Sequence, residues 1–202
     1  MTEEASGSRR IHVSGYDRQA ADFYPTPGWV TEALLKNAKL RGPVWEPCCG
    51  DGAMARVMEQ AGHKVVATDL LDRGFGRGGV DFFECTALPE GCRALVTNPP
   101  YGEAGQPANS AVGMQKFVRH ALDLTVRANG QLALLVRFQW MAGKKASTLI
   151  SSGPLSRVVV LTKRIQWFEM GERTTTGQHH HAWLFWDCSY GRLLPPSLVF
   201  AP

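Results

Sequence analysis

"GPVWEPCCGDGAMARVMEQAGHKVVATDL" (residues 42–70) predicts a strand, a glycine-containing loop, a helix and a second strand in succession. The apolar "PVW" comes first, and the loop "EPCCGDG" (46–52) follows it. We expect the helix to run from about residue 53 to residue 61, with Gly62 ending it. The second strand is "KVVATDL" (64–70). This order is typical of an α/β fold whose strands run parallel.

The alternation of helices and strands continues on both sides of this stretch. "TPGWVTEALLKNA" (26–38) predicts a helix with Thr26 as its N-cap and Pro27 at its first position. Downstream we expect a helix over residues 111–128 and strands over residues 79–84, 92–98, 131–138, 156–163 and 181–187. The last two strands lack a helix-length link, which favours an antiparallel pair at one edge. The chain therefore predicts an α/β domain with a mostly parallel sheet.

Length and composition are those of an ordinary globular domain. The chain has 202 residues, of which 44% are hydrophobic and 20% charged. "MTEEASGSRR" is polar and no apolar stretch follows it, which argues against a secretory signal. We expect a disordered arm over residues 1–15 and a single domain over residues 16–202. No apolar stretch reaches the roughly 18 residues of a membrane span, so no membrane partner is expected.

The five cysteines bear on the compartment and on metal binding. Their number is odd and none forms a CxxC pair, so neither a disulfide framework nor a zinc site is expected. This pattern favours a reducing, cytoplasmic location. "HHH" (179–181) is the other candidate metal ligand set, but it leads into an apolar strand. We therefore expect no metal site.

Charge is distributed unevenly along the chain. Residues 1–100 carry 11 Lys and Arg against 13 Asp and Glu, whereas residues 101–202 carry 11 against 5. A basic second half suits a polyanionic partner such as a nucleic acid. Surface lysines also commonly do no more than solvate a face, so charge alone leaves both interpretations open.

A stiff turn follows the buried strand that is expected near residue 95. "TNPPYG" (97–102) comes directly after the apolar "ALV" (94–96). Proline cannot donate a hydrogen bond to a sheet, and it holds the residue before it, Asn98, in an extended conformation. Ligands of α/β sheets bind beyond the carboxyl ends of the strands. Both this turn and "EPCCGDG" stand at such ends, so we expect a ligand site there.

The glycine loop and an acidic residue predict how that ligand is held. Gly50 and Gly52 allow close approach of the backbone, and the start of the helix favours negative charge. The loop has neither the GxGxxG spacing of dinucleotide folds nor the GK[ST] ending of a P-loop. Asp69 ends the second strand, where a carboxylate can accept hydrogen bonds from ribose hydroxyls. The alternative for Asp69 is a capping role in a surface loop.

These motifs together resemble the S-adenosylmethionine-dependent amino-methyltransferases, and specifically the N6-adenine DNA methyltransferases. "DFYPTP" (22–27) is similar to the family's N-terminal motif, "EPCCGDG" to its cofactor loop and "TDL" (68–70) to its ribose-binding acid. "DFF" (81–83) is similar to the segment that contacts the cofactor's adenine, and "NPPY" (98–101) to the catalytic tetrapeptide. The match covers residues 22–101 and continues more loosely to residue 187.

The resemblance implies a Rossmann-like class I methyltransferase fold. Its sheet would have seven strands, mostly parallel, with an antiparallel edge strand and helices on both faces. The implied cofactor is S-adenosylmethionine. The residues that the resemblance assigns to cofactor binding are Tyr24, Thr26, Glu46, Pro47, Cys48, Gly50, Asp51, Gly52, Asp69, Leu70, Asp81 and Phe82. For Cys48 and Phe82, packing in the loop or the core is the competing interpretation.

The catalytic residues implied are Asn98, Pro99, Pro100 and Tyr101. An exocyclic adenine amine is a poor nucleophile because its lone pair is delocalised into the ring. The amide oxygen of Asn98 and the carbonyl of Pro99 can each accept one N–H of that amine, which aims the lone pair at a sulfonium methyl group. Catalysis is then positioning by fixed dipoles, without a strong general base. Tyr101 offers a face on which a flipped base can stack.

The implied partner is DNA, or alternatively RNA. Tetrapeptides of this kind also occur in enzymes that methylate a glutamine side chain, because every such substrate presents a planar amine. The candidate recognition loops, about 101–112, 139–147 and 165–180, are too short for a separate target-recognition domain, as in small phage or mobile-element methyltransferases. We therefore expect relaxed or short sequence specificity, or a partner that supplies it. The candidate substrate-binding residues are Lys144, Lys145, Arg164, Trp167, Phe168 and Arg173, with core packing as the alternative for the two aromatic ones.

Overall fold

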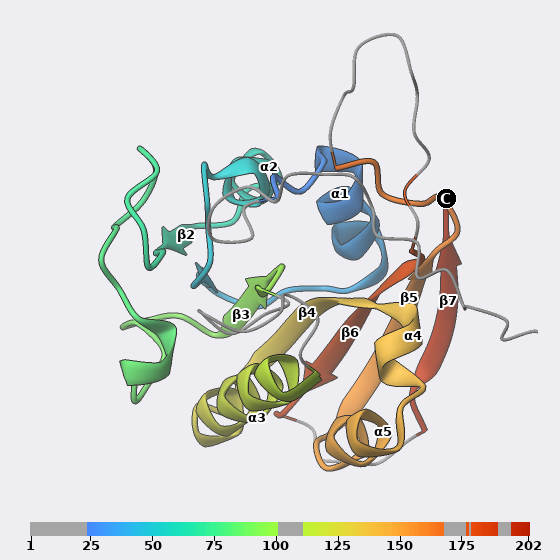
Figure 1. Ribbon diagram of the computed structural model, residues 1–202. Coiled ribbons are helices and arrows are strands. Elements are labelled where there is room, and N and C mark those ends of the chain that lie inside the picture. The colour runs from blue at the N-terminus through green and yellow to red at the C-terminus, as the bar shows by residue number, and fades with distance from the viewer. Residues whose placement is uncertain (1–23, 101–110, 168–176, 178, 190–194) are drawn as a thin grey trace, which may run out of the picture.

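The computed structural model describes residues 24–100, 111–167, 177, 179–189 and 195–202 (Figure 1). The predicted arm over residues 1–15 lies outside these ranges. Seven strands form one sheet in the order β2-β1-β3-β4-β6-β5-β7. They are β1 (Val44–Glu46), β2 (Val65–Ala67), β3 (Ala94–Thr97), β4 (Gln131–Arg137), β5 (Leu155–Leu161), β6 (His181–Asp187) and β7 (Ser197–Ala201).

Helices cover both faces of the sheet (Figure 1). They are α1 (Gly28–Asn37), α2 (Ala53–Gln60), α3 (Ala111–Arg127), α4 (Phe138–Met141) and α5 (Lys144–Ser151), with a 3₁₀ turn η2 (Phe82–Glu84). Successive residues of a strand point to opposite faces. In β3, Ala94 and Val96 pack with α1 and α2, whereas Leu95 packs with α3 and α5. The sheet therefore has a buried apolar layer on each side, as its continuously apolar strands predicted.

The predicted fold class is confirmed as a seven-stranded, mostly parallel sheet with helices on both faces. The expected antiparallel pairing of the strands 156–163 and 181–187 is confirmed by β5 and β6, but the antiparallel strand β6 lies inside the sheet and not at its margin. β6 pairs antiparallel with β4 on one side and with β5 on the other. All residues from His181 to Trp186 are buried, and such burial requires a neighbour on both edges of a strand. The unbroken apolar run "AWLFW" already carried this signal.

Two strand assignments also differ from those expected from the sequence. The segment 79–84 forms no strand in the structure, because the Asp81 side chain accepts a hydrogen bond from the Phe83 backbone at 2.8 Å and starts η2 instead. The seventh strand is β7, which was not among the strands expected. It pairs parallel with β5 along the outer edge, where Leu198 and Phe200 remain mostly exposed. Among the described helices, none is long and apolar enough to cross a membrane.

Candidate cofactor and catalytic site

Three of the predicted motifs meet at one edge of the sheet. β1 lies between β2 and β3 and runs parallel to both. Their carboxyl ends are therefore neighbours: β1 leads into Glu46 and the glycine loop, β2 leads into Asp69, and β3 leads into Asn98. Segments about 20 to 50 residues apart in sequence thus form one site (Figure 1). The parallel pairing is what brings them together.

Asp69 ties the end of β2 to the glycine loop. Its Oδ2 atom accepts a hydrogen bond from the Gly50 backbone N–H at 2.8 Å, and its Oδ1 accepts one from the Leu71 backbone at 2.9 Å. Gly50 has a φ of 56°, in the region that glycine tolerates best. The carboxylate therefore holds the loop in position, and each oxygen keeps acceptor capacity for a further donor.

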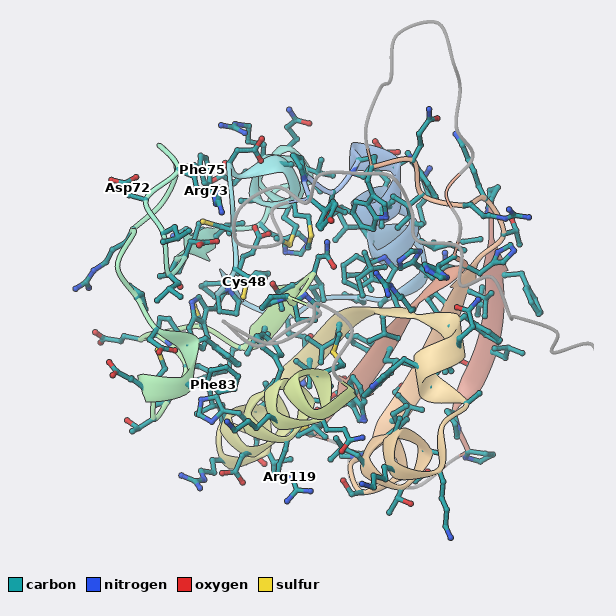
Figure 2. All side chains as sticks on the ribbon, in the orientation of Figure 1. Cys48, Asp72, Arg73, Phe75, Phe83 and Arg119 are labelled. Carbon is teal, nitrogen blue, oxygen red and sulfur yellow. The ribbon has the colours of Figure 1, made fainter. Side chains whose placement is uncertain are left out.

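Gly52 makes room for a neighbouring aromatic ring. A Cβ on Gly52 would lie 2.4 Å from ring carbons of Phe75, and the residue has a φ of 84°. Phe75 lies beside α2 (Figure 2), and the Arg56 guanidinium of that helix lies 4.6 Å from the centre of its ring. The Cys49 Sγ lies 3.5 Å from the Phe75 carbonyl oxygen. Sequence reasoning assigned Gly52 to a ligand and missed Phe75. The glycine-rich context of Phe75, "DRGFGRGG", was the available signal.

Glu46 is a buried carboxyl at the start of the loop. Only 1% of it is exposed, and its Oε2 has no hydrogen-bond partner among the described residues. Burial raises the pKa of Glu46 well above its usual value, and the carboxylates of Asp69 and Asp51 raise it further, against the opposing effect of the Ala55 backbone N–H. The site therefore holds one buried carboxyl with a strong tendency to bind a proton or a donor group.

The remaining residues of the loop have local structural contacts. The Asp51 Oδ1 accepts a hydrogen bond from the Ala53 backbone at 3.1 Å, at the start of α2. Pro47 is buried. Burial raises the pKa of the Cys48 thiol, and that of the Cys49 thiol to about 12, so neither is a thiolate at neutral pH. The burial of both thiols favours a packing role for Cys48 and Cys49.

Asn98 and Thr26 are hydrogen-bonded across the site. The Asn98 Nδ2 donates to the Thr26 Oγ1 at 3.2 Å, while the Asn98 Oδ1 is buried and has no hydrogen-bond partner among the described residues. Thr26 was predicted as the N-cap of the first helix, and this is wrong. α1 begins at Gly28, Pro27 occupies the cap position, and no side chain caps the helix. Thr26 instead contacts Asn98 of the NPPY segment.

The other predicted cofactor residues are more dispersed. Tyr24 lies edge-on to Trp167, with ring centres 5.8 Å apart. Leu70 is 58% exposed, just beyond β2. Phe82 is buried and stacks on Phe117 at 4.3 Å, so it packs in the core, and its contact with a cofactor stays a prediction. Asp81 accepts the hydrogen bond that starts η2.

The predicted catalytic and substrate residues are described in part. Pro99 is buried and Pro100 is exposed. Lys144 and Lys145 are exposed and open α5, shortly after the carboxyl end of β4. Arg164 is exposed. Trp167 is half-buried between Tyr24 and His181, and its ring lies 5.5 Å from that of His181. Tyr101, Phe168 and Arg173 lie outside the described residues.

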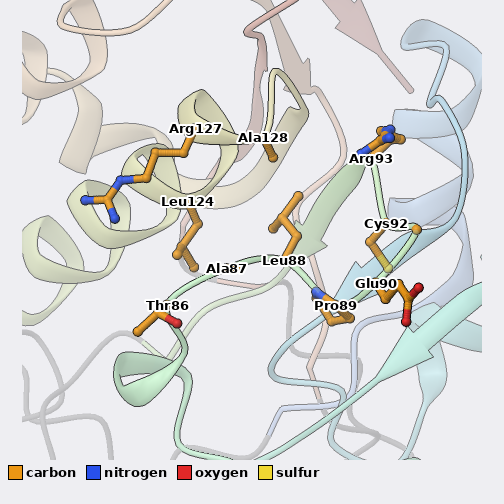
Figure 3. Close-up of a pocket in the computed structure, with 11 residues that line it drawn as sticks. Thr86, Ala87, Leu88, Pro89, Glu90, Cys92, Arg93, Leu124, Arg127 and Ala128 are labelled. Atoms are coloured by element: carbon orange, nitrogen blue, oxygen red, sulfur yellow. The ribbon is translucent and has the colours of Figure 1, made fainter.

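A separate pocket opens at the opposite end of β3. It has a volume of about 290 Å³ and lies between the segment before β3 and the end of α3 (Figure 3). Its walls include Leu88, Cys92, Arg93 and Leu124. None of the predicted motifs reaches it, so it is not the candidate site. In the part of the chain that the structure describes, no group of three or more His, Cys, Asp or Glu residues is arranged to hold a metal ion.

Comparison by sequence identifies no relative: no family model matches the chain, and no curated protein matches it significantly. Solved structures do match. A Listeria monocytogenes protein assigned to the class I S-adenosylmethionine-dependent methyltransferases is 15% identical, with a TM-score of 0.54 over 86% of this chain and 63% of that chain. The modification subunit assigned to a type I restriction enzyme of Vibrio vulnificus is 16% identical, with a TM-score of 0.52 over 83% and 45%.

A Pyrococcus horikoshii protein assigned as an RNA methyltransferase is also similar, at 15% identity and a TM-score of 0.51 over 82% of this chain and 86% of that chain. The matches to the Listeria and Vibrio proteins cover 63% and 45% of those chains, so this chain spans less than two thirds of their length. At these identities the likeness concerns the fold. The chain has the Rossmann-like class I fold of S-adenosylmethionine-dependent methyltransferases, as the sequence motifs implied.

Proposed function

We propose that this protein uses S-adenosylmethionine to methylate the exocyclic N6 amine of adenine in DNA. The observation that carries the proposal is the Asn98 amide. Its Oδ1 atom is buried without a described partner at the carboxyl end of β3, next to the glycine loop that follows β1. A buried acceptor left unpaired costs free energy unless a ligand supplies the donor. A planar amine is such a donor.

The residues at this edge fit the cofactor. Asp69 is anchored by the Gly50 backbone and keeps acceptor capacity for ribose hydroxyls. Glu46 adds a second buried acceptor, the unpartnered Oε2. The cofactor supplies an electrophilic methyl group on a sulfonium. The resemblance assigns its binding to Tyr24, Thr26, Glu46, Pro47, Cys48, Gly50, Asp51, Gly52, Asp69, Leu70, Asp81 and Phe82. Among these, the contacts in the structure give most support to Glu46, Gly50 and Asp69.

Asn98 and Pro99 act on the target amine. The Asn98 Oδ1 accepts one N–H and the Pro99 carbonyl accepts the other, so the nitrogen lone pair leaves conjugation with the ring. Bound S-adenosylmethionine would supply the methyl group for the new N–C bond, with its sulfur as the leaving group. The nitrogen then carries a positive charge, becomes acidic and loses its proton to water. Because Pro99 and Pro100 have no N–H, no backbone donor competes for the acceptors. The rate gain comes from fixed dipoles.

DNA is favoured over the alternatives by two features of the sequence. The "DFYPTP" segment precedes the cofactor loop, and residues 101–202 carry a surplus of positive charge. In this proposal Tyr101 stacks on the flipped base, while Lys144, Lys145, Arg164 and Arg173 contact phosphates and Trp167 or Phe168 contacts the base. Because the loops are short, few residues are available to recognise bases. The protein therefore recognises a short sequence or has relaxed sequence specificity.

Transfer of a labelled methyl group tests the proposal. The purified protein is incubated with methyl-labelled S-adenosylmethionine and with DNA, RNA or protein substrates, and the labelled product is identified after digestion. The expected product is N6-methyladenine in DNA. Asn37→Ala, an asparagine on α1 whose Nδ2 donates to the Ala33 carbonyl, is the matched control for substitutions of Asn98. Label in RNA alone, in glutamine, or in no substrate would contradict the proposal.

A further inference from the structure

We propose that Thr26 is a positioning residue that orients the Asn98 amide for methyl transfer. This inference rests on the proposed function and deepens it. The resemblance alone assigns Thr26 to the cofactor, and the helix pattern assigns it to a cap. In the structure no side chain caps α1, and the Thr26 Oγ1 lies 3.2 Å from the Asn98 Nδ2.

The hydrogen bond joins two residues whose backbones are stiff. Thr26 stands between Pro25 and Pro27, and Asn98 stands before Pro99 and Pro100. Proline fixes its own φ and restricts the residue that precedes it. Thr26 is also β-branched, which limits rotation about its χ1, and only 5% of it is exposed. A contact between two such residues holds the amide plane in one orientation at little further entropic cost.

The sense of that orientation decides whether Asn98 can act. An amide presents an acceptor at Oδ1 and donors at Nδ2. With Nδ2 bonded to Thr26, Oδ1 is left for the N–H of the target amine, and it is this oxygen that lacks a described partner. If the amide were rotated by half a turn, Nδ2 would face the amine and two donors would meet. The observed hydrogen bond, in which the Thr26 Oγ1 is the acceptor, therefore holds Asn98 in the productive state.

Thr31 offers a matched control nearby in the chain. It is fully buried in α1, and its Oγ1 has no hydrogen-bond partner among the described residues. Thr31→Val therefore removes a buried hydroxyl while the hydrogen bond between Thr26 and Asn98 stays intact. Thr26→Val removes the acceptor while keeping the β-branched shape, and Thr26→Ser keeps the acceptor while removing a methyl group.

The test compares single-turnover methyl transfer at saturating cofactor with cofactor affinity measured by calorimetry. We expect Thr26→Val to lower the rate on the order of tenfold, less than removal of the aligned dipole itself costs. Its cofactor Kd should stay within about twofold of the wild-type value. Thr26→Ser should restore most of the rate, and Thr31→Val should match the wild type.

A double-mutant cycle shows whether Thr26 acts through Asn98. In an Asn98→Ala background, Thr26→Val should cause no further loss of rate. A loss of the same size in both backgrounds, or a raised cofactor Kd with an unchanged rate, would overturn the inference and place Thr26 at the cofactor. If the wild-type protein itself transfers no methyl group to any substrate, the proposed function has failed. An active wild type with an equally active Thr26→Val variant overturns the orienting role alone.

Discussion

The Asp69 carboxylate accepts a hydrogen bond from the Gly50 backbone N–H at 2.8 Å, so the end of β2 is fastened to the loop after β1. The residue proposed to bind the ribose therefore also shapes the loop proposed to hold the rest of the cofactor. A single substitution at Asp69 should disturb both.

Asp69→Ala should weaken cofactor binding by at least about tenfold, because a hydrogen bond to a charged group contributes about 1.5–3 kcal/mol. The fold should persist, since the hydrogen bonds that the carboxylate accepts in the described part of the chain come from the backbone N–H groups of Gly50 and Leu71. Calorimetry gives the affinity and circular dichroism checks the fold. The control is Asp72→Ala, an exposed aspartate that accepts a hydrogen bond from Gly74. Unchanged affinity in Asp69→Ala would remove Asp69 from the site.

Gly52→Ala should destabilise the protein more than Gly62→Ala. Both glycines have a positive φ, of 84° and 90°, so both substitutions carry a backbone cost of about 1–2 kcal/mol. Only at Gly52 would the new methyl group meet the Phe75 ring, since nothing lies within 4 Å at Gly62. The clash should add about 1–3 kcal/mol. Denaturant unfolding measures the difference, and equal losses would show that Phe75 readily moves aside.

Acid should destabilise the protein through His181. Burial, together with the smaller effect of the positive charge of Arg137, lowers the pKa of His181 to about 4. The unfolded state thus takes up a proton near pH 6.5 and the folded state only near pH 4, so the stabilisation is full above pH 6.5 and is lost as the pH falls towards 4. The loss is roughly 3 kcal/mol at about 1.4 kcal/mol per pKa unit.

The measurement is the free energy of unfolding from pH 7 to pH 4.5 in the wild type, in His181→Gln and in His63→Gln as the control. The His181→Gln variant should show the smaller decrease. A decrease equal to that of the wild type would mean that other groups cause the acid sensitivity.

Lys144 and Lys145 should contribute to the salt dependence of DNA binding. In the Lys144→Ala/Lys145→Ala double variant, the slope of log affinity against log salt should become shallower by up to about 0.9 for each phosphate that the two lysines neutralise in the wild type. The double variant Lys36→Ala/Lys39→Ala is charge-matched, and its exposed lysines lie near the amino end of β1. Equal slopes in the two double variants would show that Lys144 and Lys145 do not contact the nucleic acid.

The sequence predicted the residues at strand ends better than it predicted their partners. Asn98 and Asp69 follow apolar runs, so their positions could be inferred from strand pairing. The contact between Thr26 and Asn98 spans 72 positions and depends on packing of α1 against the sheet, which no local pattern encodes. Thr26 before Pro27 also mimics a capping sequence. The contact of Phe75 with the loop could not be predicted, because its glycine-rich surroundings indicate a flexible loop. In the structure, Gly76 and Gly78 instead allow the backbone to pack closely against Ala67 and Asp72.

Strand placement had the same limits. The helical link through α4 and α5 makes β5 parallel to β4, but only tertiary packing decides that β6 fills the space between them. A continuously buried strand cannot lie at an edge, and the apolar run in β6 could have indicated this. The segment 79–84 has the composition of a strand, and the Asp81 hydrogen bond to its own backbone overrides that preference.

The most direct test of the amide mechanism is single-turnover methylation of DNA by Asn98→Ala, with cofactor titration and the Asn37→Ala control alongside. The substitution removes the buried Oδ1 acceptor that localises the lone pair of the target amine. The rate should fall on the order of a hundredfold, while the cofactor Kd stays within a few-fold of the wild-type value and Asn37→Ala remains active. Methylation by Asn98→Ala at the wild-type rate would contradict the mechanism and leave "NPPY" as only a stiff end to β3.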